Sequence, residues 1–401
     1  MSIDMMILNT AVADFRGSQF GFVERLAGAG GLAKCRTEDM PDYTPQQYQQ
    51  MIAAGRATAG GPGNTAPLQA RAGLKVAVGV HLGKGEFDGL DAQGRFFYDT
   101  MVANGVDMSA TVVEPTLPTG TTFIYEKDNH ERGGIAYFPN ANNAFDFAHF
   151  QKAVRRLKPA MVFYMYSGLS DKGDANGGRD LAAFMKACRQ DGMLTIADSH
   201  TLTGNPQRVI ASKMEVEHYR LLEPLLPELD VFFTSYDEAR MIENTLGEKG
   251  RYDGISEQAY IVHFLEFLAE RFWRDNPHSK LFGVTVKDGA VVMYRDAAGG
   301  ITTPMKVTSR FMCGSVVDLC GAGDSFRAGL TAYIARNADR FKTGRIDVQQ
   351  AVQMGNLFAS LYVKSPLHNR YANIGTYDKM LAVIQRDNVY ADFADLTAAV
   401  K

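Results

Sequence analysis

The amino-acid sequence predicts an α/β protein built on a mostly parallel central sheet. Short apolar runs of strand length recur along the chain, and amphipathic segments of helical length separate them. Runs that are apolar throughout are typical of parallel strands buried on both faces, with helices joining them through right-handed crossovers. The predicted strands are 76–80, 160–166, 194–198, 231–235 and 282–286, and the predicted helices are 94–104, 180–191, 237–245 and 256–274.

Composition restricts the kind of partner. The 401 residues include 42 Lys and Arg against 45 Asp and Glu, so no overall basic field would attract nucleic acid. The four cysteines form no C-x-x-C pair, which argues against a disulfide scaffold and a zinc site. The first residues lack a basic signal-peptide region, and no apolar run approaches membrane-spanning length. We therefore expect a cytoplasmic protein with a small-molecule partner, and neither nucleic acid nor membrane as partner.

Three stretches interrupt the alternation of strands and helices. Residues 15–57 are rich in Gly, Gln and mixed polar groups, and 111–139 alternates between polar and apolar residues. The second stretch predicts strands at 121–125 and 135–138, joined by a polar turn. Together these two stretches predict a small β lid set against the main sheet. Residues 201–227, a polar loop followed by a helical pattern, are interpreted as a surface insertion.

The most informative segment is DLCGAGDSF, which begins at Asp318. A short apolar strand runs into Gly321, Ala322 and Gly323, here called the glycine loop, and apolar residues then recur at helical spacing. Backbone N–H groups at a helix N-terminus, next to small residues, predict an anion-binding loop. Asp324 follows directly and could accept a proton from a hydroxyl while the loop stabilises a phosphoryl group. The alternative interpretation is an acidic cap in the first helical turn.

The segment resembles the C-terminal signature D-T-x-G-A-G-D-x-F of the PfkB carbohydrate kinase family, the ribokinase-like kinases. The resemblance implies one kinase domain over 1–401, with a ribokinase-like three-layer α/β/α core, a mostly parallel central sheet and a small β lid. It also implies that Asp324 is the catalytic base and that the amides of the glycine loop form the anion hole. Asp318 matches an acidic residue that often helps to bind a monovalent cation such as K⁺, although Leu319 stands where Thr is usual.

Other segments match the family in the same order along the chain. Gly60, Gly61 and Asn64 resemble the signature G-G-x-x-x-N-x-A, which implies substrate binding. Either Gly60 and Gly61 are the glycine pair and the loop is one residue short, or Ala59 replaces the first Gly; the alternative to both is a plain Gly/Pro turn. Asp14 follows the first apolar segment and matches the substrate-hydroxyl Asp at the end of the family's first strand. Arg132, from the lid, is a candidate to reach substrate or phosphate, with a solvated arginine as the alternative.

Nucleotide binding is implied by two further segments. Thr285, Lys287 and Gly289 resemble the nucleotide loop T-x-G-x-x-G, with Lys287 near the place of the first Gly. Asn356 and Ser360 lie one helical turn apart where related kinases place groups near the adenine, and polar positions on a half-buried helix are the alternative. The resemblance therefore implies ATP as a substrate.

A magnesium ligand is implied at Glu238, with the neighbouring Asp237 as a candidate stand-in for an Asn of the family motif. Glu238 matches the acidic residue of the motif N-x-x-E, which organises Mg²⁺ through water, and Ser235 stands where the family has Asn. Magnesium keeps several waters and uses few carboxylates, so one such residue is chemically sufficient. The alternative is a pair of ordinary first-turn acids.

The sequence thus predicts ATP-dependent phosphorylation of a hydroxyl of a small carbohydrate. A nucleoside kinase, adenosine-like, and a catalytically inactive binding homologue are the alternatives, and a homodimer through the lid is a further expectation. A nucleobase needs stacking aromatics, for which the candidates are Phe15, Phe20, Phe22, Phe123, Tyr125 and Tyr137.

An oxidoreductase of the Rossmann type is not supported. Gly28, Gly30 and Ala33 fit G-x-G-x-x-[GA], but no convincing strand precedes them, and no acidic residue follows about twenty positions on.

Overall fold

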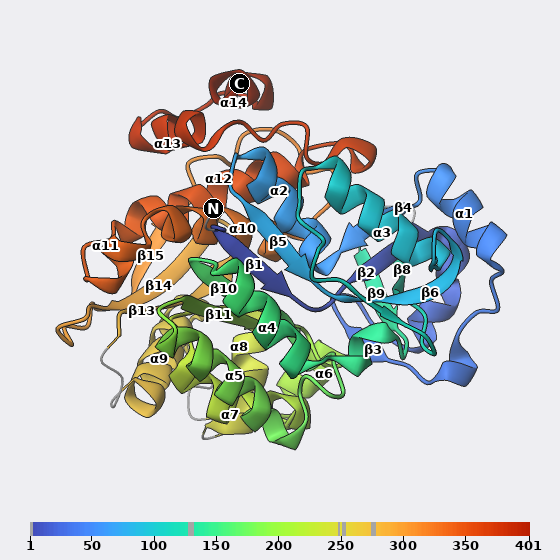
Figure 1. The fold of residues 1–401 in the computed structure, drawn as a ribbon. Helices are drawn as coiled ribbons and strands as arrows, with labels where there is room; N and C mark the ends of the chain where they lie inside the picture. The colour runs from blue at the N-terminus through green and yellow to red at the C-terminus, as the bar shows by residue number, and fades with distance from the viewer. Residues whose placement is uncertain (1–2, 127–131, 248, 251–253, 274–277) are drawn as a thin grey trace.

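A computed structural model describes residues 3–126, 132–247, 249–250, 254–273 and 278–401 (Figure 1). Among these residues, an eight-stranded sheet has the order β15-β14-β13-β12-β11-β10-β1-β5. The strands from β13 to β5 run parallel, and β14 and β15 add an antiparallel edge. The bounds are β1 (Met5–Leu8), β5 (Val76–Gly79), β10 (Met161–Ser167), β11 (Leu194–Ser199), β12 (Val231–Ser235), β13 (Lys280–Val286), β14 (Gly289–Arg295) and β15 (Met305–Thr308).

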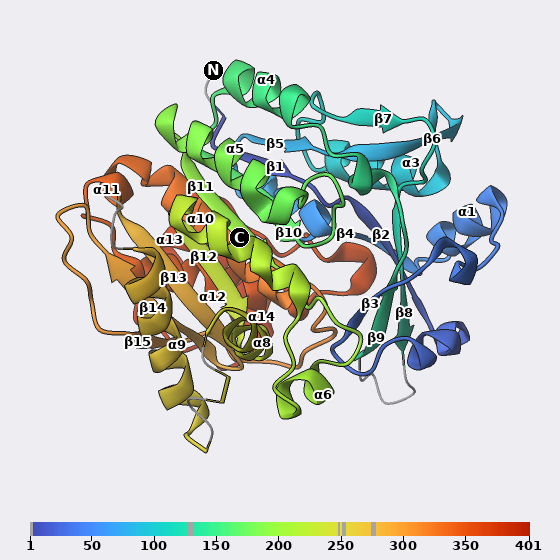
Figure 2. The same ribbon diagram turned by 90° about the horizontal axis from the view of Figure 1, so that it is seen from below.

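Helices cover both faces of this sheet. In Figure 1 one layer lies above it and the other below, and Figure 2 shows α4, α5 and α9 from below, in front of the strands. All residues of β1, β5, β10 and β11 are buried, as expected for strands between two helical layers. The upper layer holds α2 (Ala66–Arg71), α10 (Ala322–Arg336) and α12 (Val348–Val363), with α13 (Tyr377–Gln385) and α14 (Phe393–Val400) packed outside α12; the lower layer holds α4 (Phe147–Leu157), α5 (Arg179–Gln190), α8 (Tyr236–Leu246) and α9 (Glu257–Phe272).

The predicted α/β fold with a mostly parallel sheet is confirmed. The five predicted strands correspond to β5, β10, β11, β12 and β13, and the four predicted helices to α3 (Ala92–Ala103), α5, α8 and α9. The predicted ends differ from the observed ends by at most two residues. Continuous apolar runs and regular helical periodicity therefore located the core elements.

The first apolar segment, which comes before Asp14, is divided between two sheets. Residues 5–13 are not one strand: β1 ends at Leu8, and the chain turns before β2 (Val12–Gly17) begins. The side chains of Asn9 and Thr10 are buried at this turn and donate to the Tyr164 hydroxyl (3.2 Å) and the Met165 carbonyl (3.3 Å). The expectation that Asp14 ends the first strand was wrong, since Asp14 lies inside β2, in a second sheet.

The second sheet lies beside the core, on the right in Figure 1, and has the order β3-β9-β8-β2-β4. It draws on both stretches predicted to form a lid, and we call it the lid sheet. Its outer face carries a small core of its own, which includes Phe15, Phe20 and Phe123 and is closed by Tyr48 of α1 (Pro45–Ala53). The bounds are β2, β3 (Leu32–Lys34), β4 (Ala57–Gly60), β8 (Gly120–Glu126) and β9 (Arg132–Tyr137), with β6 (His81–Phe87) and β7 (Val112–Glu114) forming a separate pair.

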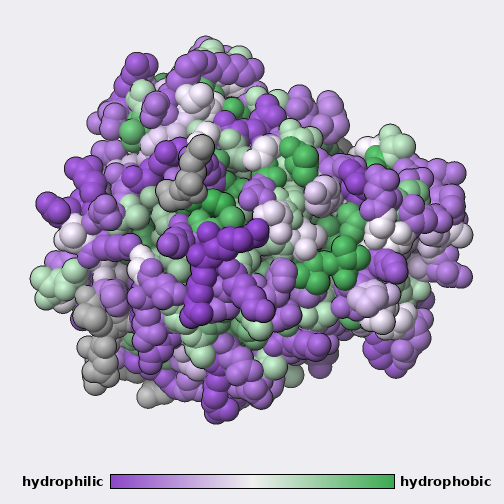
Figure 3. Space-filling model, in the orientation of Figure 1, coloured by the Kyte–Doolittle hydropathy of each residue, from purple (hydrophilic) through white to green (hydrophobic). Residues whose placement is uncertain are grey.

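The stretch interpreted as a surface insertion is only partly at the surface. It contains α6 (Pro206–Ala211), the 3-10 turn Glu217–Leu221 and α7 (Leu222–Leu225). Tyr219 and Leu222 are fully buried in the main core, so the second half of this segment contributes to packing. The face drawn in Figure 3 is mostly hydrophilic, with hydrophobic residues gathered in smaller areas. In the described part of the chain, no helix is long and apolar enough to span a bilayer.

Candidate active site

The glycine loop lies at the N-terminus of α10, as predicted. Gly321 caps the helix with a φ of 82°, in the left-handed region that favours glycine. A Cβ at this position would come within 3.0 Å of the Asn64 side chain and of the Tyr362 ring. The N–H of Ala322 donates to the Leu319 carbonyl (3.1 Å), a bond that an arriving anion would have to replace. The backbone of the loop therefore lies close to the side chains of Asn64 and Tyr362, next to the positive end of a 15-residue helix.

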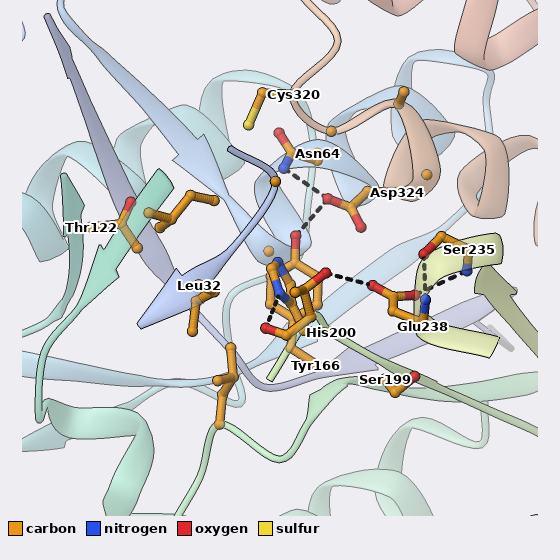
Figure 4. Close-up of a pocket in the computed structure, with 18 of the residues that line it drawn as sticks. Leu32, Asn64, Thr122, Tyr166, Ser199, His200, Ser235, Glu238, Cys320 and Asp324 are labelled. Carbon is orange, nitrogen blue, oxygen red and sulfur yellow. Dashed lines mark hydrogen bonds between the residues drawn. The ribbon is translucent and has the colours of Figure 1, made fainter. Parts of the chain in front are cut away.

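Asp324 lies in the first turn of α10, with its carboxylate almost buried (Figure 4). Its Oδ2 accepts hydrogen bonds from the Asn64 amide (3.0 Å) and the Tyr166 hydroxyl (2.5 Å). Its Oδ1 accepts a bond from the Arg327 guanidinium (2.9 Å). Asn64 and Asp324, which are 260 positions apart, are thus in direct contact.

Tyr166 reaches Asp324 because the end of β10 is irregular. The register between β10 and β11 shifts between Tyr164 and Ser167, and Tyr166 has a φ of 59°, which is uncommon for a residue other than glycine. Burial, together with the negative charge of Asp324, raises the pKa of Tyr166 well above its usual value. The phenol is therefore a neutral donor to the carboxylate.

Arg327 joins Asp324 to a second buried carboxylate. Asp198 lies near the carboxyl end of β11, and Arg327 contacts it at 2.7 Å as well as contacting Asp324. Burial raises the pKa of Asp198 to about 7, and Asp324 adds to the rise while Arg327 opposes it. For Arg327, burial alone would lower the pKa, but the two carboxylates raise it overall, so this guanidinium keeps its charge.

A cavity between the lid sheet and the glycine loop contains several predicted residues, and we call it the lid-side cavity. Asp14, Gly61, Asn64 and the glycine loop line it together with Asp324. The Thr122 hydroxyl donates to Asp14 Oδ1 (2.5 Å). Gly60 lies behind this carboxylate, where a Cβ would come within 2.4 Å of Asp14 Oδ2. The side chain of Arg132 lies outside the described part of the structure.

The lid-side cavity also has an apolar wall. Of the six aromatic candidates for nucleobase stacking, Tyr137 lines the cavity, whereas the other five belong to or pack against the outer core of the lid sheet. More of the apolar lining residues are aliphatic than aromatic. The larger aliphatic ones are Val12, Leu32, Ile135, Leu169, Pro206 and Leu319, and the aromatic ones are Tyr137 and Tyr166.

A second cavity, the outer cavity, brings together the residues predicted to bind a nucleotide: Thr285, Lys287, Gly289, Asn356 and Ser360. Its lining also includes the exposed apolar side chains of Met312, Val316 and Leu319, a surface suited to a flat apolar group. Six residues line both cavities, namely Ser235, Asp237, Thr285, Leu319, Ala322 and Gly323. The two cavities therefore meet at the glycine loop.

Glu238 forms a capping box with Ser235 at the start of α8. Its Oε2 accepts from the Ser235 N–H and the Thr234 hydroxyl (both 2.9 Å), and its Oε1 accepts from Thr201 (3.2 Å). Serine is a good N-cap, which explains structurally why it can replace asparagine here. No cluster of three His, Cys, Asp or Glu in the described residues could hold a metal directly. With Asp237 beside it at the cavity wall, Glu238 fits Mg²⁺ as a partner reached through water.

Asp318 does not fit a monovalent cation. One carboxylate oxygen is paired with both Arg16 and Arg370, and the other accepts the Cys320 N–H (2.9 Å). Burial alone would raise the pKa of Asp318, but the two guanidinium groups lower it overall. A cation at this carboxylate would contact two positive charges, so K⁺ is not placed here.

Tyr166, Asp198, Arg327 and Arg370 are not predicted by the motifs. Arg327 follows Asp324 by three positions, a helical spacing at which opposite charges are neighbours, so this ion pair could have been predicted from the sequence. Asp198 ends a predicted strand, and carboxyl ends of parallel strands gather at one edge of a sheet. Tyr166 reaches the site through a backbone irregularity, and Arg370 through a contact with Asp318, 52 positions away in the chain. No local sequence pattern indicates either of these.

The comparison with known families identifies the class of protein. The sequence model described as pfkB family carbohydrate kinase matches residues 39–252 and 287–370, which is most of the chain. The protein therefore belongs to the PfkB family of carbohydrate kinases. Among curated proteins, none matches the sequence significantly.

Solved structures share the fold at low sequence identity. Adenosine kinase from Schistosoma mansoni, in complex with 2-fluoroadenosine, has a TM-score of 0.63 at 14% identity, covering 94% of this chain and 99% of its own. A putative ribokinase II from E. coli, with ATP and Mg²⁺, has a TM-score of 0.59 at 16% identity, covering 96% and 100%. Fructokinase from Xylella fastidiosa, with bound ATP, has a TM-score of 0.59 at 19% identity, covering 95% and 98%. The protein thus has the ribokinase-like fold, with sugar and nucleoside kinases among its structural neighbours.

Proposed function

We propose that the protein is an ATP-dependent phosphotransferase that phosphorylates a hydroxyl group of a small carbohydrate. The observation that carries this proposal is the position of Asp324. Its carboxylate lines the lid-side cavity directly after the glycine loop, and this loop is where the lid-side cavity and the outer cavity meet. A substrate hydroxyl in the first cavity and a phosphate chain in the second would meet at this carboxylate.

In the proposed reaction, Asp324 accepts the proton of the attacking hydroxyl. The hydroxyl oxygen bonds to the γ-phosphorus while the bond from that phosphorus to the bridging oxygen of ADP breaks. N–H groups of the glycine loop and the positive end of α10 stabilise the charge on the transferring group. Asp14 and Asn64 are proposed to orient the hydroxyl groups of the acceptor, because both residues line the same cavity.

The outer cavity is proposed to hold ATP. Thr285, Lys287 and Gly289 would lie along the phosphates and Asn356 near the base, which agrees with the shared lining of this cavity. Mg²⁺, held through water at Glu238, would offset negative charge on the phosphates. The E. coli and Xylella kinases bound ATP in their structures, which supports the choice of nucleotide.

A nucleoside is the second candidate acceptor, and the apolar wall of the lid-side cavity favours it. A free sugar offers mainly hydroxyls, whereas a nucleobase offers flat faces that Leu32, Ile135 and Tyr137 could contact. The Schistosoma adenosine kinase was solved with a nucleoside analogue, although its low identity supports the fold alone.

A coupled assay of ADP release tests the proposal and separates the two acceptors. Sugars, sugar phosphates, sugar acids and nucleosides are each supplied with ATP and Mg²⁺, and we expect acceptor-dependent ADP release. The variant Leu32→Asn is then expected to raise KM for a nucleoside acceptor and to leave a small sugar unaffected. If no acceptor in any class promoted ADP release, the result would favour the alternative that the protein is a catalytically inactive binding homologue.

A homodimer through the lid sheet is also proposed, from the family resemblance. Light scattering coupled to gel filtration tests it. A mass near 44.0 kDa would indicate a monomer and contradict this part of the proposal.

A further inference from the structure

We propose that two buried guanidinium groups take the place of a monovalent cation at Asp318, so that the protein works without K⁺ and Arg370 positions the glycine loop. The inference rests on the proposed phosphotransferase activity, because the loop is the proposed anion hole. It also makes a claim about ion binding that can be measured without turnover.

Three donors from the protein already occupy the carboxylate of Asp318. Arg16 and Arg370 both donate to its Oδ2, and the Cys320 N–H donates to its Oδ1. The side chains of the two arginines are only 5% and 3% exposed. A monovalent cation would need oxygen ligands at this point and would find both oxygens already paired.

Charge balance gives the same answer. One carboxylate and two guanidinium groups leave a net charge of about +1 directly before the glycine loop. A cation bound to Asp318 alone would leave this region neutral, so the arginines provide at least as much positive charge as the ion would. A further positive ion a few ångströms away would be repelled by both.

Arg370 connects this charge to the backbone of the loop. It follows the 3-10 turn Leu367–Asn369 after α12, and its guanidinium donates to the Cys320 carbonyl (2.8 Å), the residue before Gly321. The same nitrogen donates to the Tyr362 hydroxyl (2.8 Å), whose ring centre lies 4.6 Å from the guanidinium carbon. One side chain thus holds the start of the loop and the end of α12.

The connection continues to Asp324. The Tyr362 hydroxyl donates to Asn64 Oδ1 (2.5 Å), and the Asn64 amide donates to Asp324 Oδ2. Arg370 therefore acts on the proposed base indirectly, through Tyr362 and Asn64 and through the backbone of the glycine loop, and it is a positioning residue. Displacements of about 1 Å in such a chain are enough to lower turnover about 10²-fold.

Arg16 connects the lid sheet to the carboxylate of Asp318. It belongs to β2, and it donates to Thr58 of β4 (3.2 Å) as well as to Asp318. The carboxylate before the glycine loop is therefore held from the core by Arg370 and from the lid sheet by Arg16. An exchangeable ion has no covalent bond to either part, whereas each guanidinium is attached to the backbone of the part from which it reaches Asp318.

The first experiment compares salts on the wild-type protein. Turnover is measured at equal ionic strength in KCl, NaCl and tetramethylammonium chloride, and the melting temperature of the ligand-free protein is measured in the same salts. We expect K⁺ to change neither quantity relative to Na⁺. A K⁺-specific rise in turnover or in melting temperature would overturn the inference.

The second experiment removes the internal cation. Arg370→Ala is expected to lower kcat/KM about 10²-fold, with partial recovery on adding methylguanidinium or K⁺, and to gain a K⁺-specific rise in melting temperature. Arg370→Lys keeps the charge without the planar fork, and we expect intermediate activity. The exposed Arg345→Ala serves as the matched control, with no change in activity or in salt response.

The outcomes separate this inference from the proposed function. Wild-type activity and salt response in Arg370→Ala would overturn the inference alone. If the wild type released no ADP with any acceptor, the proposed function would fail, while the melting temperatures in K⁺ and Na⁺ would still decide the ion claim. If Arg370→Ala did not fold, the wild-type salt comparison and Arg370→Lys would decide it.

Discussion

Asp318 and Asp324 lie on either side of the glycine loop, and their surroundings differ in charge. Asp318 is paired with two guanidinium groups of its own, from Arg16 and Arg370, and does not line either cavity. Asp324 shares one guanidinium with Asp198, takes its other hydrogen bonds from neutral donors, and faces the lid-side cavity. Two aspartates six positions apart are thus placed for different work: the first fixes the backbone before the loop, and the second can exchange a neutral donor for a substrate hydroxyl.

The largest expected effect comes from exchanging the two aspartates for asparagine one at a time. Asp324→Asn removes the proposed proton acceptor, and we expect phosphoryl transfer to fall by roughly 10²- to 10⁴-fold. Nucleotide binding, measured by calorimetry, should change little, because the outer cavity is intact.

Asp318→Asn is the matched comparison, since it leaves two buried guanidinium groups facing an amide. We expect it chiefly to lower the melting temperature. Near-wild-type turnover in Asp324→Asn would refute the assignment of the base, and equal loss of turnover without destabilisation in both variants would remove the distinction between them.

The next effect concerns the shared guanidinium. Arg327→Met leaves Asp198 and Asp324 buried without their common partner, and we expect a loss of about 3 kcal/mol in the free energy of unfolding. Urea denaturation measures this loss. The double variant Arg327→Met with Asp198→Asn removes one of the two charges and should recover part of it. No recovery would show that packing of the arginine stem, and not its charge, stabilises the site.

The sequence predicted the elements of the core more fully than the side-chain contacts of the site. The buried strands are continuous apolar runs, and the glycine loop is a local motif, so both are determined within a few positions of the chain. The position of Asp14 was different, since the apolar run through residues 5–13 conceals a turn. Only buried hydrogen bonds from Asn9 and Thr10 to β10 reveal where the chain leaves the main sheet.

The aromatic residues of the lid give a second reason. Phe15 alternates with polar residues as a binding surface would, and Phe123 follows two threonines, but alternation cannot tell which face of a strand meets the cavity. With Phe20 of the 3-10 helix Ser18–Arg25 and Tyr48 of α1, they form the core on the outer side of the lid sheet. Contacts between residues far apart in the chain, such as that of Arg370 with Asp318, could not be predicted either, because a local sequence pattern does not name a distant partner.

A smaller effect is a pH dependence that arises from Asp198. Its pKa is about 7 in the folded protein against 3.8 for the ordinary group, so between these values the folded state holds a proton that the unfolded state has lost. Stability from this group is therefore complete below about pH 4 and is lost as the pH rises to about 7, by at most ~1.4 kcal/mol per pH unit. Asp198→Asn should remove this slope in urea denaturation from pH 4.5 to 7.5. An unchanged slope would assign the dependence to other groups.

The smallest expected effect distinguishes two neighbouring tyrosines. Tyr166→Phe removes one neutral donor from Asp324, and Tyr164→Phe removes a buried hydroxyl on the same strand that contacts Asn9 and Asp174. Each should lower the free energy of unfolding by about 1 kcal/mol. Only Tyr166→Phe should also lower kcat, by roughly tenfold or less, because only its hydroxyl orients the proposed base. Equal kcat values in the two variants would mean that Asn64 and Arg327 suffice to hold Asp324, and the role of the irregular end of β10 would then be structural.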